Sequence, residues 1–288
     1  PEHVGNLARK VVLGDLANRQ YQGQPLGNLK MNATGVHLNN LVDQWFLGKD
    51  HPSATVDGIS HSYHCFDDDD KQPLFYIRSN GWPGIEYSDA LQGGLGDCYV
   101  FAALAAIAHH DPATIDNMFI ENGDNTYTVR FFNNGAPEYV TVNKWLPTNP
   151  PSVPGNVTTA DLAFGRVSST VSATASPDLW VPLVEKAYAQ LNESGWIGRD
   201  GENAYQSLEG GTADDVIEAI TGLKYGAYSG SNWDQTQRNN IVNAFNAGQF
   251  VALGTKDDPN AVMGTPLTAN HGYAMVAHKP PTTVSPGD

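Results

Sequence analysis

Hydrophobic residues gather in blocks along this chain, and the two longest blocks predict its central helices. No residue in the stretch 98–108 is charged, so we expect a helix that is buried on all sides. The polar residues 109–112, which end in proline, predict where it stops. The second block runs from residue 180 to residue 191, and its apolar residues recur at helical spacing. Pro182 lies in the first turn of the predicted helix, where proline is tolerated. These apolar residues are Trp180, Leu183, Val184, Ala187, Tyr188 and Leu191. We expect this helix to pack against the first.

Alternating apolar and polar residues predict a β-hairpin between the two helices. Residues 126–132 are rich in β-formers, the turn residues 133–135 read Asn-Asn-Gly, and residues 138–142 return. Two short apolar runs bounded by turns, 250–253 and 272–277, predict further strands.

Two more helices are predicted in the last third of the chain. Thr212 and Asp215 have the spacing of a capping box and open a helix that would close at Gly222. A second helix is predicted over 235–245, with Gly248 beyond its end.

The remaining stretches are polar or broken by Gly and Pro. Within residues 1–60, the pieces 11–16 and 38–47 are amphipathic. This region is either a leader that packs on the rest of the chain or a linker from an upstream domain. Residues 74–87 predict a short strand followed by an irregular loop. Residues 147–178 are rich in Pro, Ser, Thr and Ala and predict a long surface loop.

Composition limits the classes of partner. The 288 residues carry 31 Asp and Glu against 16 Lys and Arg, a formal net charge of −15, which argues against nucleic acid and anionic membranes. No run of 18 apolar residues exists, so no membrane-spanning helix is expected. The chain begins at Pro1 without Met or a signal-peptide pattern, and we interpret it as a piece of a longer protein. The two cysteines, Cys65 and Cys98, make no disulfide framework.

An acidic stretch at 61–71 suggests a metal site. His61, His64, Cys65 and the four residues Asp67–Asp70 have side chains that bind zinc or calcium. The run of Asp lacks the alternating ligands and the glycine of an EF-hand loop. We therefore interpret it as a solvated acidic loop.

Cys98 stands where a glycine-rich turn meets the first hydrophobic block. At the N-terminus of the predicted helix, unpaired N–H groups and the helix dipole stabilise a thiolate. The side-chain NH2 of Gln92, together with the backbone N–H of Cys98, would form an oxyanion hole. The alternative is a small buried cysteine behind a glycine turn, because free cysteine is among the most buried residue types.

The stretch 92–99, Gln-Gly-Gly-Leu-Gly-Asp-Cys-Tyr, resembles the catalytic signature of the calpain-type cysteine proteases. The family's signature reads Gln-Gly-x-Leu-Gly-Asp-Cys-Trp, so Tyr99 replaces a tryptophan. Four further segments resemble that family in the same order, and the resemblance covers about residues 80 to 277. These segments are 179–189, 208–212, 221–223 and 270–276.

The resemblance implies a two-lobed, papain-like α+β fold and a cysteine endopeptidase. The helix-rich lobe would span 61–209 and carry the nucleophile Cys98, with Gln92 in the oxyanion hole. The strand-rich lobe would span 210–288, carry the catalytic His271 and be incomplete. The chemistry agrees, because a thiol needs a base of near-neutral pKa and His271 would open a strand facing a cleft.

The resemblance also assigns a substrate site and leaves one catalytic position empty. In the family, extended peptide backbone binds beside a Gly-Gly pair, which Gly210 and Gly211 match. The physical reason would be close backbone approach, and a hinge is the alternative. The family's orienting Asn follows the His in an Asn-Pro-Trp-Gly context that is absent here. Asn270 is not assigned to that role, since a strand neighbour points to the opposite face.

Calcium is the cofactor that the resemblance implies. The family's site in the first lobe uses two acids at positions that match Asp89 and Asp178. Carbonyls at positions matching Trp82 and Gly84 complete it. Carboxylates, carbonyls and water give the oxygen-rich shell that calcium prefers. The alternative is that Asp89 and Asp178 are ordinary surface acids.

Two other functions remain open at this stage. The first is a pseudo-protease that keeps the fold and acts as an interaction or regulatory module, which the missing Asn favours. The second is another papain-like acyl transfer enzyme, such as a transglutaminase or a cell-wall amidase. The expected partners of a protease are protein or peptide substrates and other domains of a longer parent chain, and the resemblance implies an intracellular location.

Overall fold

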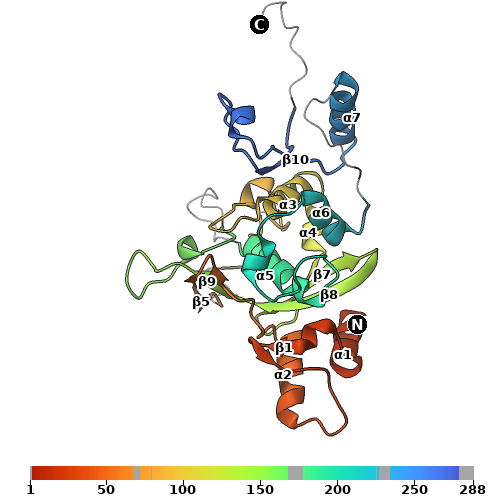
Figure 1. Ribbon diagram of the computed structural model, residues 1–288, viewed down its shortest axis with the longest axis vertical. Coiled ribbons are helices and arrows are strands. Elements are labelled where there is room, and N and C mark those ends of the chain that lie inside the picture. The colour runs from red at the N-terminus through yellow and green to blue at the C-terminus, as the bar shows by residue number, and fades with distance from the viewer. Residues whose placement is uncertain are drawn as a thin grey trace, which may run out of the picture.

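The computed structural model describes residues 2–67, 72–78, 80–167, 178–224, 226 and 234–278. Helices and strands are mixed along the chain, so the fold is α+β as predicted. Figure 1 shows the N-terminal helices at one end, the sheet and the buried helices in the middle, and the segment carrying β10 at the other end.

A three-stranded antiparallel sheet forms one layer of the core. Its strands are β6 (Phe119–Glu121), β7 (Thr126–Asn133) and β8 (Ala136–Asn143), in the order β6-β7-β8. Asn133 pairs with Ala136, so Asn134 and Gly135 alone make the turn, and both have positive φ. This is the backbone of a type I′ turn, which Asn-Gly favours. The predicted hairpin is confirmed.

The first predicted helix is α3 (Cys98–His110), and the 3-10 turn η2 (Tyr87–Asp89) precedes it. Apolar side chains are buried around its whole circumference, as expected. The helix runs two residues further than the uncharged block, and α4 (Pro112–Asp116) follows with Pro112 at its first position. His109 and His110 therefore lie at the opposite end of α3 from Cys98.

The second predicted helix is α5 (Trp180–Leu191), and every residue in it is buried. The prediction gave it one buried face, so the burial of Glu185 and Lys186 corrects it. Lys186 is buried because its ammonium donates to three oxygens, the carbonyl and side-chain oxygens of Asn143 and the carbonyl of Trp145, at 2.7–2.9 Å.

The neighbours of α5 also differ in part from expectation. It shares the hydrophobic core with α3, but its backbone packs mainly on β8, on β9 (Trp145–Thr148) and on the 3-10 turns η4 (Asn192–Ser194) and η5 (Tyr205–Leu208). β9 pairs with β5 (Ser62–Cys65) in a separate antiparallel ribbon. The partners of α5 thus come mostly from strands remote in sequence.

The predicted surface loop over 147–178 holds at 149–161, where no residue is buried, but is wrong at 147–148, which belong to β9, and at 162–164. Leu162, Ala163 and Phe164 follow the 3-10 turn η3 (Thr159–Asp161) and are 2% exposed each. They pack into the main core because this segment pairs with the turn before Cys98. The rest of the predicted loop, 168–177, lies outside the described residues. The strand expected near residue 77 is reduced to a single bridge between Ile77 and Pro83.

The N-terminal region folds into helices that cover β8. Helix α1 (Glu2–Leu13) and helix α2 (Gly35–Phe46) pack on each other and on that strand. The predicted amphipathic piece 38–47 lies in α2, whereas the piece 11–16 spans the end of α1 at Gly14, whose φ is +97°. Short elements complete the region: η1 (Leu16–Arg19), β1 (Gln20–Tyr21), β2 (Gln24–Pro25), β3 (Thr55–Val56) and β4 (Ile59–Ser60).

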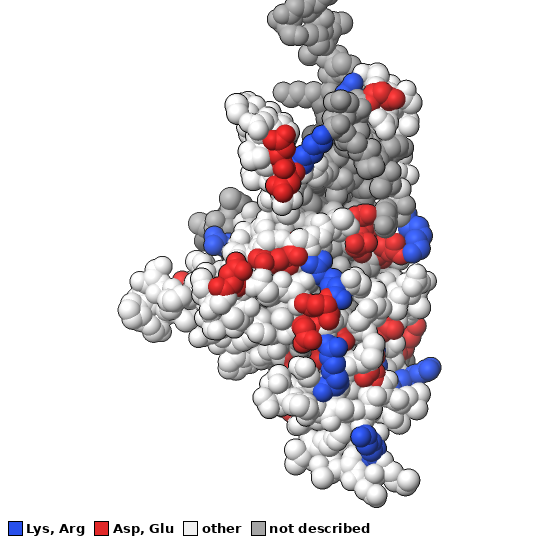
Figure 2. All heavy atoms as spheres, in the orientation of Figure 1, with Lys and Arg blue, Asp and Glu red and all other residues white. Residues whose placement is uncertain are grey.

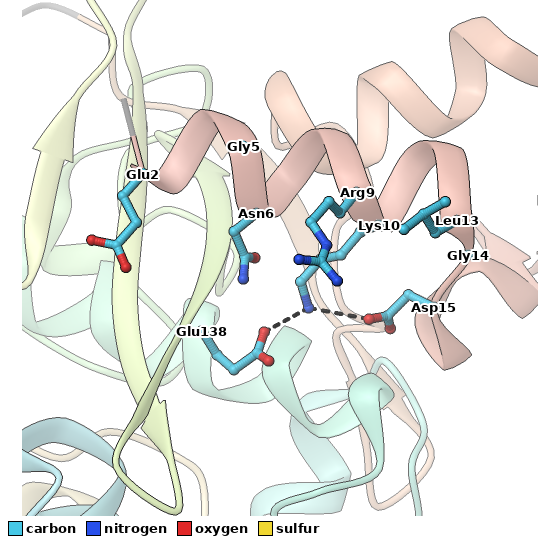
Figure 3. Close-up of a pocket in the computed structure, with 9 residues that line it drawn as sticks. All are labelled: Glu2, Gly5, Asn6, Arg9, Lys10, Leu13, Gly14, Asp15 and Glu138. Carbon is cyan, nitrogen blue, oxygen red and sulfur yellow. Dashed lines mark hydrogen bonds and ion pairs between the residues drawn. The ribbon is translucent and has the colours of Figure 1, made fainter.

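A surface pocket of about 480 Å³ lies between α1 and β8 (Figure 3). Figure 3 shows Lys10 at its centre, between two acids, with ion pairs of 3.1 Å to Asp15 and 2.8 Å to Glu138. The Lys10 ammonium also lies 4.7 Å from the ring centre of Trp45. Lys10 thus bridges the two acids at the pocket's centre, and its ion pair with Glu138 joins α1 to the sheet.

Acidic residues predominate, and basic side chains are spread among them. Figure 2 shows Lys and Arg interspersed with Asp and Glu on the face drawn, with uncharged residues over most of it. Some cations are used inside the fold, as Lys10 and Lys186 are. Within the described residues, no helix has the length and apolar character needed to cross a membrane.

The last part of the chain contacts the N-terminal half of the molecule mainly through α3 and, at α6, also through β7. It comprises α6 (Ala213–Thr221), α7 (Gln235–Asn246), β10 (Ala252–Gly254), η6 (Pro259–Val262) and β11 (Gly272–Ala274). Both predicted strands are present but shorter, and they pair antiparallel. β11, β10 and α6 all pack on α3. α6 ends at Gly222 as predicted, but Thr212 donates its hydroxyl to Asp215 and forms no capping box.

Candidate active site

The turn before Cys98, residues 92–97, is hydrogen-bonded to the segment 162–166 and packs closely against it. The N–H of Gly94 donates to a carbonyl of that segment at 2.8 Å. A Cβ at Gly93 would lie 1.8 Å from the carbonyl oxygen of Phe164, so no residue other than glycine fits there. Glycine at position 93 therefore serves the close packing of the two segments.

Cys98 is the first residue of α3, as predicted, and its thiol is partly exposed. The N–H of Gly272 donates to the Cys98 sulfur at 3.3 Å. A Cβ at Gly272 would come within 3.2–3.3 Å of the backbone of Cys98 and Tyr99. Glycine thus lets the start of β11 approach the N-terminus of the helix closely enough for this bond.

His271 immediately precedes that donor, at the beginning of β11. Its Cα is two bonds from the Gly272 nitrogen, about 2.4 Å away, which places it within about 6 Å of the sulfur. Thr255 holds the backbone: its N–H donates to the His271 carbonyl at 2.9 Å, and its hydroxyl accepts from the His271 N–H at 3.0 Å. The imidazole contacts the ring of Tyr273 edge-on at 4.9 Å.

Gln92 lies in the same turn, and its amide is engaged locally. Its Nε2 donates to the carbonyl of Leu95 at 2.6 Å, which closes the turn. An amide nitrogen carries two hydrogens, so a second donor remains after this bond. From the sequence we expected this amide to turn toward the same spot as the Cys98 N–H, whereas the bond that the structure shows is the one to Leu95.

Gly210 and Gly211 require glycine for different reasons. Gly210 has a φ of +66°, in the left-handed region that glycine favours. A Cβ at Gly211 would lie 2.6–2.8 Å from the ring of Tyr99. The N–H of Gly210 donates to the carbonyl of Gly96 at 2.9 Å, so the pair is attached to the turn that carries Cys98.

Two buried acids lie directly behind the nucleophile, and neither was predicted to have a role. Asp97 and Glu185 are at most 1% exposed. The Gly165 N–H donates to Glu185 Oε2 at 2.7 Å, while the other Glu185 oxygen and both Asp97 oxygens have no hydrogen-bond donor within the part of the chain that the structure describes. In the sequence, the feature that could have pointed to such a role is an acidic residue, Glu185, in the middle of the second apolar block.

These two acids satisfy each other only if they share a proton. Burial raises the pKa of Glu185 well above its usual range, and the neighbouring Asp97 charge raises it further. Burial raises the pKa of Asp97 to about 7, although a hydrogen bond from Glu185 opposes that shift. Both effects indicate that Glu185 keeps the proton and donates it to the Asp97 carboxylate.

A second acidic pair consists of Asp89 and Asp178, which are buried rather than ordinary surface acids. Burial raises the pKa of Asp89 to about 6, and the charge of Asp178 contributes. Burial also raises the pKa of Asp178. Among the described residues no Lys or Arg pairs with either acid. The two carboxylates therefore lie near each other without a balancing cation.

The loop next to this pair is held by backbone bonds. Trp82 accepts at its carbonyl from Arg78 N–H at 2.9 Å, and Gly84 N–H donates to Tyr76 O at 2.7 Å. Tyr76 N–H in turn donates to Asp178 at 3.1 Å. The residues at the four expected calcium positions thus belong to one connected region of the structure.

The alternative metal site at 61–71 is not supported where the structure describes it. Within the described residues, no three His, Cys, Asp or Glu side chains group closely enough to hold a metal ion. His61 and His64 make edge contacts with phenylalanine rings. Asp68–Asp70 lie outside the described residues.

Comparison with known proteins gives one matching family and several relatives. The family model described as calpain family cysteine protease matches residues 72–284. A calpain-type cysteine protease ADL1 of Oryza sativa subsp. japonica is 32% identical over 154 residues, covering 52% of this chain and 6% of the relative. Calpain clp-1 of Caenorhabditis elegans is 26% identical over 195 residues, covering 65% and 22%. The chain thus spans less than a quarter of the length of these relatives.

The shared proton makes a testable contribution to stability. In Glu185→Gln the side-chain amide can accept from Gly165 and donate permanently to Asp97. The parent's Glu185 binds a proton in the folded state that the unfolded state has released above about pH 4.5. Its free energy of unfolding should therefore fall, relative to the variant, by about 1.4 kcal/mol per pH unit between about pH 5 and 7.

Urea unfolding of both proteins across this pH range measures the difference. The surface substitution Glu121→Gln is the matched control and should leave the slope of the parent unchanged. Parallel stability curves for the parent and Glu185→Gln would show that the buried acids share no proton.

Proposed function

Because the chain belongs to the calpain family of cysteine proteases, we propose that it hydrolyses peptide bonds with Cys98 as nucleophile and His271 as general base and acid. The observation that carries this proposal is the hydrogen bond from Gly272 N–H to the Cys98 sulfur, because it leaves the Cα of His271 within about 6 Å of that sulfur. The substrates would be proteins or peptides that bind in extended form.

The proposed reaction proceeds through an acyl-enzyme. His271 takes the thiol proton, and the thiolate attacks the carbonyl carbon of the scissile bond. The C–N bond breaks as His271 returns the proton to the leaving amine. A water molecule, deprotonated by His271, then attacks the thioester. The free acid leaves, and Cys98 recovers its proton.

The negative oxygen formed in each attack needs two donors. The backbone N–H of Cys98 is one, because the first N–H groups of a helix have no partner within it. Gln92 would supply the second through the amide hydrogen that its bond to Leu95 leaves available.

We further propose that the site lies between two lobes. The helix-rich lobe, 61–209, would provide α3 with Cys98, and the strand-rich lobe, 210–288, would provide β11 with His271. Gly210 and Gly211 would bind the substrate backbone at their boundary. The packing of β11 on α3 supports this arrangement.

Calcium is proposed as the ion that balances Asp89 and Asp178. The residues fit a hard cation: two buried carboxylates that have no basic partner among the described residues, next to a loop whose carbonyls include those of Trp82 and Gly84. A bound cation would offset the burial of Asp89 and the charge of Asp178, which together raise the Asp89 pKa. It would also join the loop before the catalytic turn to the start of α5.

The catalytic assignment predicts a sharp contrast between the two cysteines. Cys98→Ala should abolish turnover of a fluorogenic peptide, because it removes the nucleophile, whereas Cys65→Ala should retain it. Gln92→Ala should lower kcat by about 10²–10³, the effect of one oxyanion donor. Turnover is measured with reduced protein in the presence of calcium.

The outcome also separates the proposal from its alternatives. Parent-level turnover in Cys98→Ala would refute the mechanism. A folded parent with a reduced Cys98 and calcium that shows no turnover would favour the pseudo-protease. Transfer of the acyl group to an added amine, without peptide hydrolysis, would indicate a transferase.

Calcium should raise the thermal midpoint of the parent, since an ion that binds only the folded state stabilises it. The double variant Asp89→Asn, Asp178→Asn should lose this shift. The shift should also be smaller at pH 5 than at pH 7.5, because protons compete for Asp89, whose pKa is about 6. Thermal scans with calcium and with a chelator give the comparison.

A matched control is the exposed pair Asp57→Asn, Asp257→Asn, which removes the same charge elsewhere. It should keep the full response to calcium. An equal calcium shift in both double variants would place calcium at another site, and no shift in the parent would remove calcium from the proposal.

A further inference from the structure

Arg199 occupies a loop that closes over the Gly-Gly pair. The loop joins η4 to η5, and its own hydrogen bonds give it a defined shape. Asp200 accepts from Asn192 at 2.6 Å, from Ser207 at 2.8 Å and from the N–H of Glu202 at 3.0 Å. The residue next to Arg199 is therefore fixed to both ends of the loop.

The guanidinium of Arg199 donates to three carbonyls within residues 207–210, the chain that leads to the site. Nε donates to the carbonyl of Ser207. Nη2 donates to the carbonyl of Glu209 at 2.8 Å and to that of Gly210. Arginine suits this task because its planar fork holds several donors in fixed directions.

The bond to the Gly210 carbonyl sets the direction of the next N–H. The Gly210 carbonyl and the Gly211 N–H belong to one planar peptide unit, and in a trans unit they point in opposite directions. Once Arg199 holds the carbonyl, the Gly211 N–H must point away from Arg199. Glycine at 210 has little steric preference of its own, so the plane depends on this external support.

Tyr99 also restricts the position of the Gly211 backbone. The Arg199 guanidinium carbon lies 5.5 Å from the Tyr99 ring centre, and that ring also leaves no space for a Cβ at Gly211. Tyr99 follows Cys98 in α3. Arg199 and Tyr99 thus connect the position of the Gly211 backbone to the helix that carries the nucleophile.

We propose that Arg199 is a positioning residue for substrate, which aims the Gly211 peptide group at the main chain of a bound peptide. This inference rests on the proposed function, because it assumes that a peptide binds beside Cys98. The residue touches neither the substrate nor the reacting atoms. It acts through the orientation of the Gly210–Gly211 peptide plane.

The test separates binding of a peptide from reactivity of the thiol. An uncharged tripeptidyl chloromethyl ketone alkylates Cys98 after binding, with a half-saturation concentration KI and a maximal rate kinact. Iodoacetamide alkylates the same thiol without a peptide backbone. Arg199→Met should raise KI about tenfold, as expected for one lost hydrogen bond. It should leave kinact and the iodoacetamide rate within about twofold of the parent.

Two further variants control for charge and for the loop. Arg199→Lys keeps the charge and some donors without the fork, and its KI should fall between parent and Arg199→Met. Arg19→Met removes an arginine that contacts the same loop at Glu202, 3.5 Å away, and should leave KI unchanged. Thermal midpoints establish that each variant is folded.

The possible results distinguish a failure of the role proposed for Arg199 from a failure of the proposed function. An unchanged KI in Arg199→Met, with saturable inactivation of the parent, would overturn the role of Arg199 and leave the proposed function standing. Equal losses in kinact and in the iodoacetamide rate would show that Arg199 supports the thiol or the fold instead. A parent that the peptide reagent does not inactivate at Cys98 would refute the proposed function and this inference with it.

Discussion

The close approach of β11 to the N-terminus of α3 is the contact on which the whole site depends. It joins residues 174 positions apart, the N–H of Gly272 and the sulfur of Cys98, at 3.3 Å. Glycine at this position leaves room for the strand against the helix backbone. The same approach places the Cα of His271 within about 6 Å of the sulfur. Thr255, which follows the paired strand β10, holds the His271 backbone through two hydrogen bonds. One backbone contact thus arranges both partners of the proposed reaction.

Two buried acids, Asp97 and Glu185, fix the position of this end of α3. Asp97 immediately precedes the helix and interacts with Glu185 of α5, and Glu185 accepts from the backbone of the segment 162–166. That segment closes over the glycines of the catalytic turn. Apolar packing alone is not directional, whereas a hydrogen bond to a buried carboxylate fixes a defined position. These acids are therefore costly in desolvation but specific in placement.

The local features of this fold could be predicted from sequence, and the remote ones could not. Uncharged stretches and periodic apolar residues located α3, α5 and the β7–β8 hairpin, and Cys98 was placed at its helix end. The loop predicted over 147–178 failed at 162–164, because pairing with a turn far away in the chain decides its burial. The burial of Glu185 in α5 was missed for the same reason. A carboxylate's partner on another segment leaves no trace in local periodicity.

The most direct test of the central claim is the pH dependence of Cys98 alkylation by iodoacetamide, followed residue by residue with mass spectrometry. Cys65 is the internal reference, since burial raises its thiol pKa. If His271 lies at the sulfur as a base, Cys98 should react much faster than Cys65 at pH 6. His271→Ala should remove most of that advantage. Equal Cys98 rates in the parent and in His271→Ala across the pH range would contradict the account.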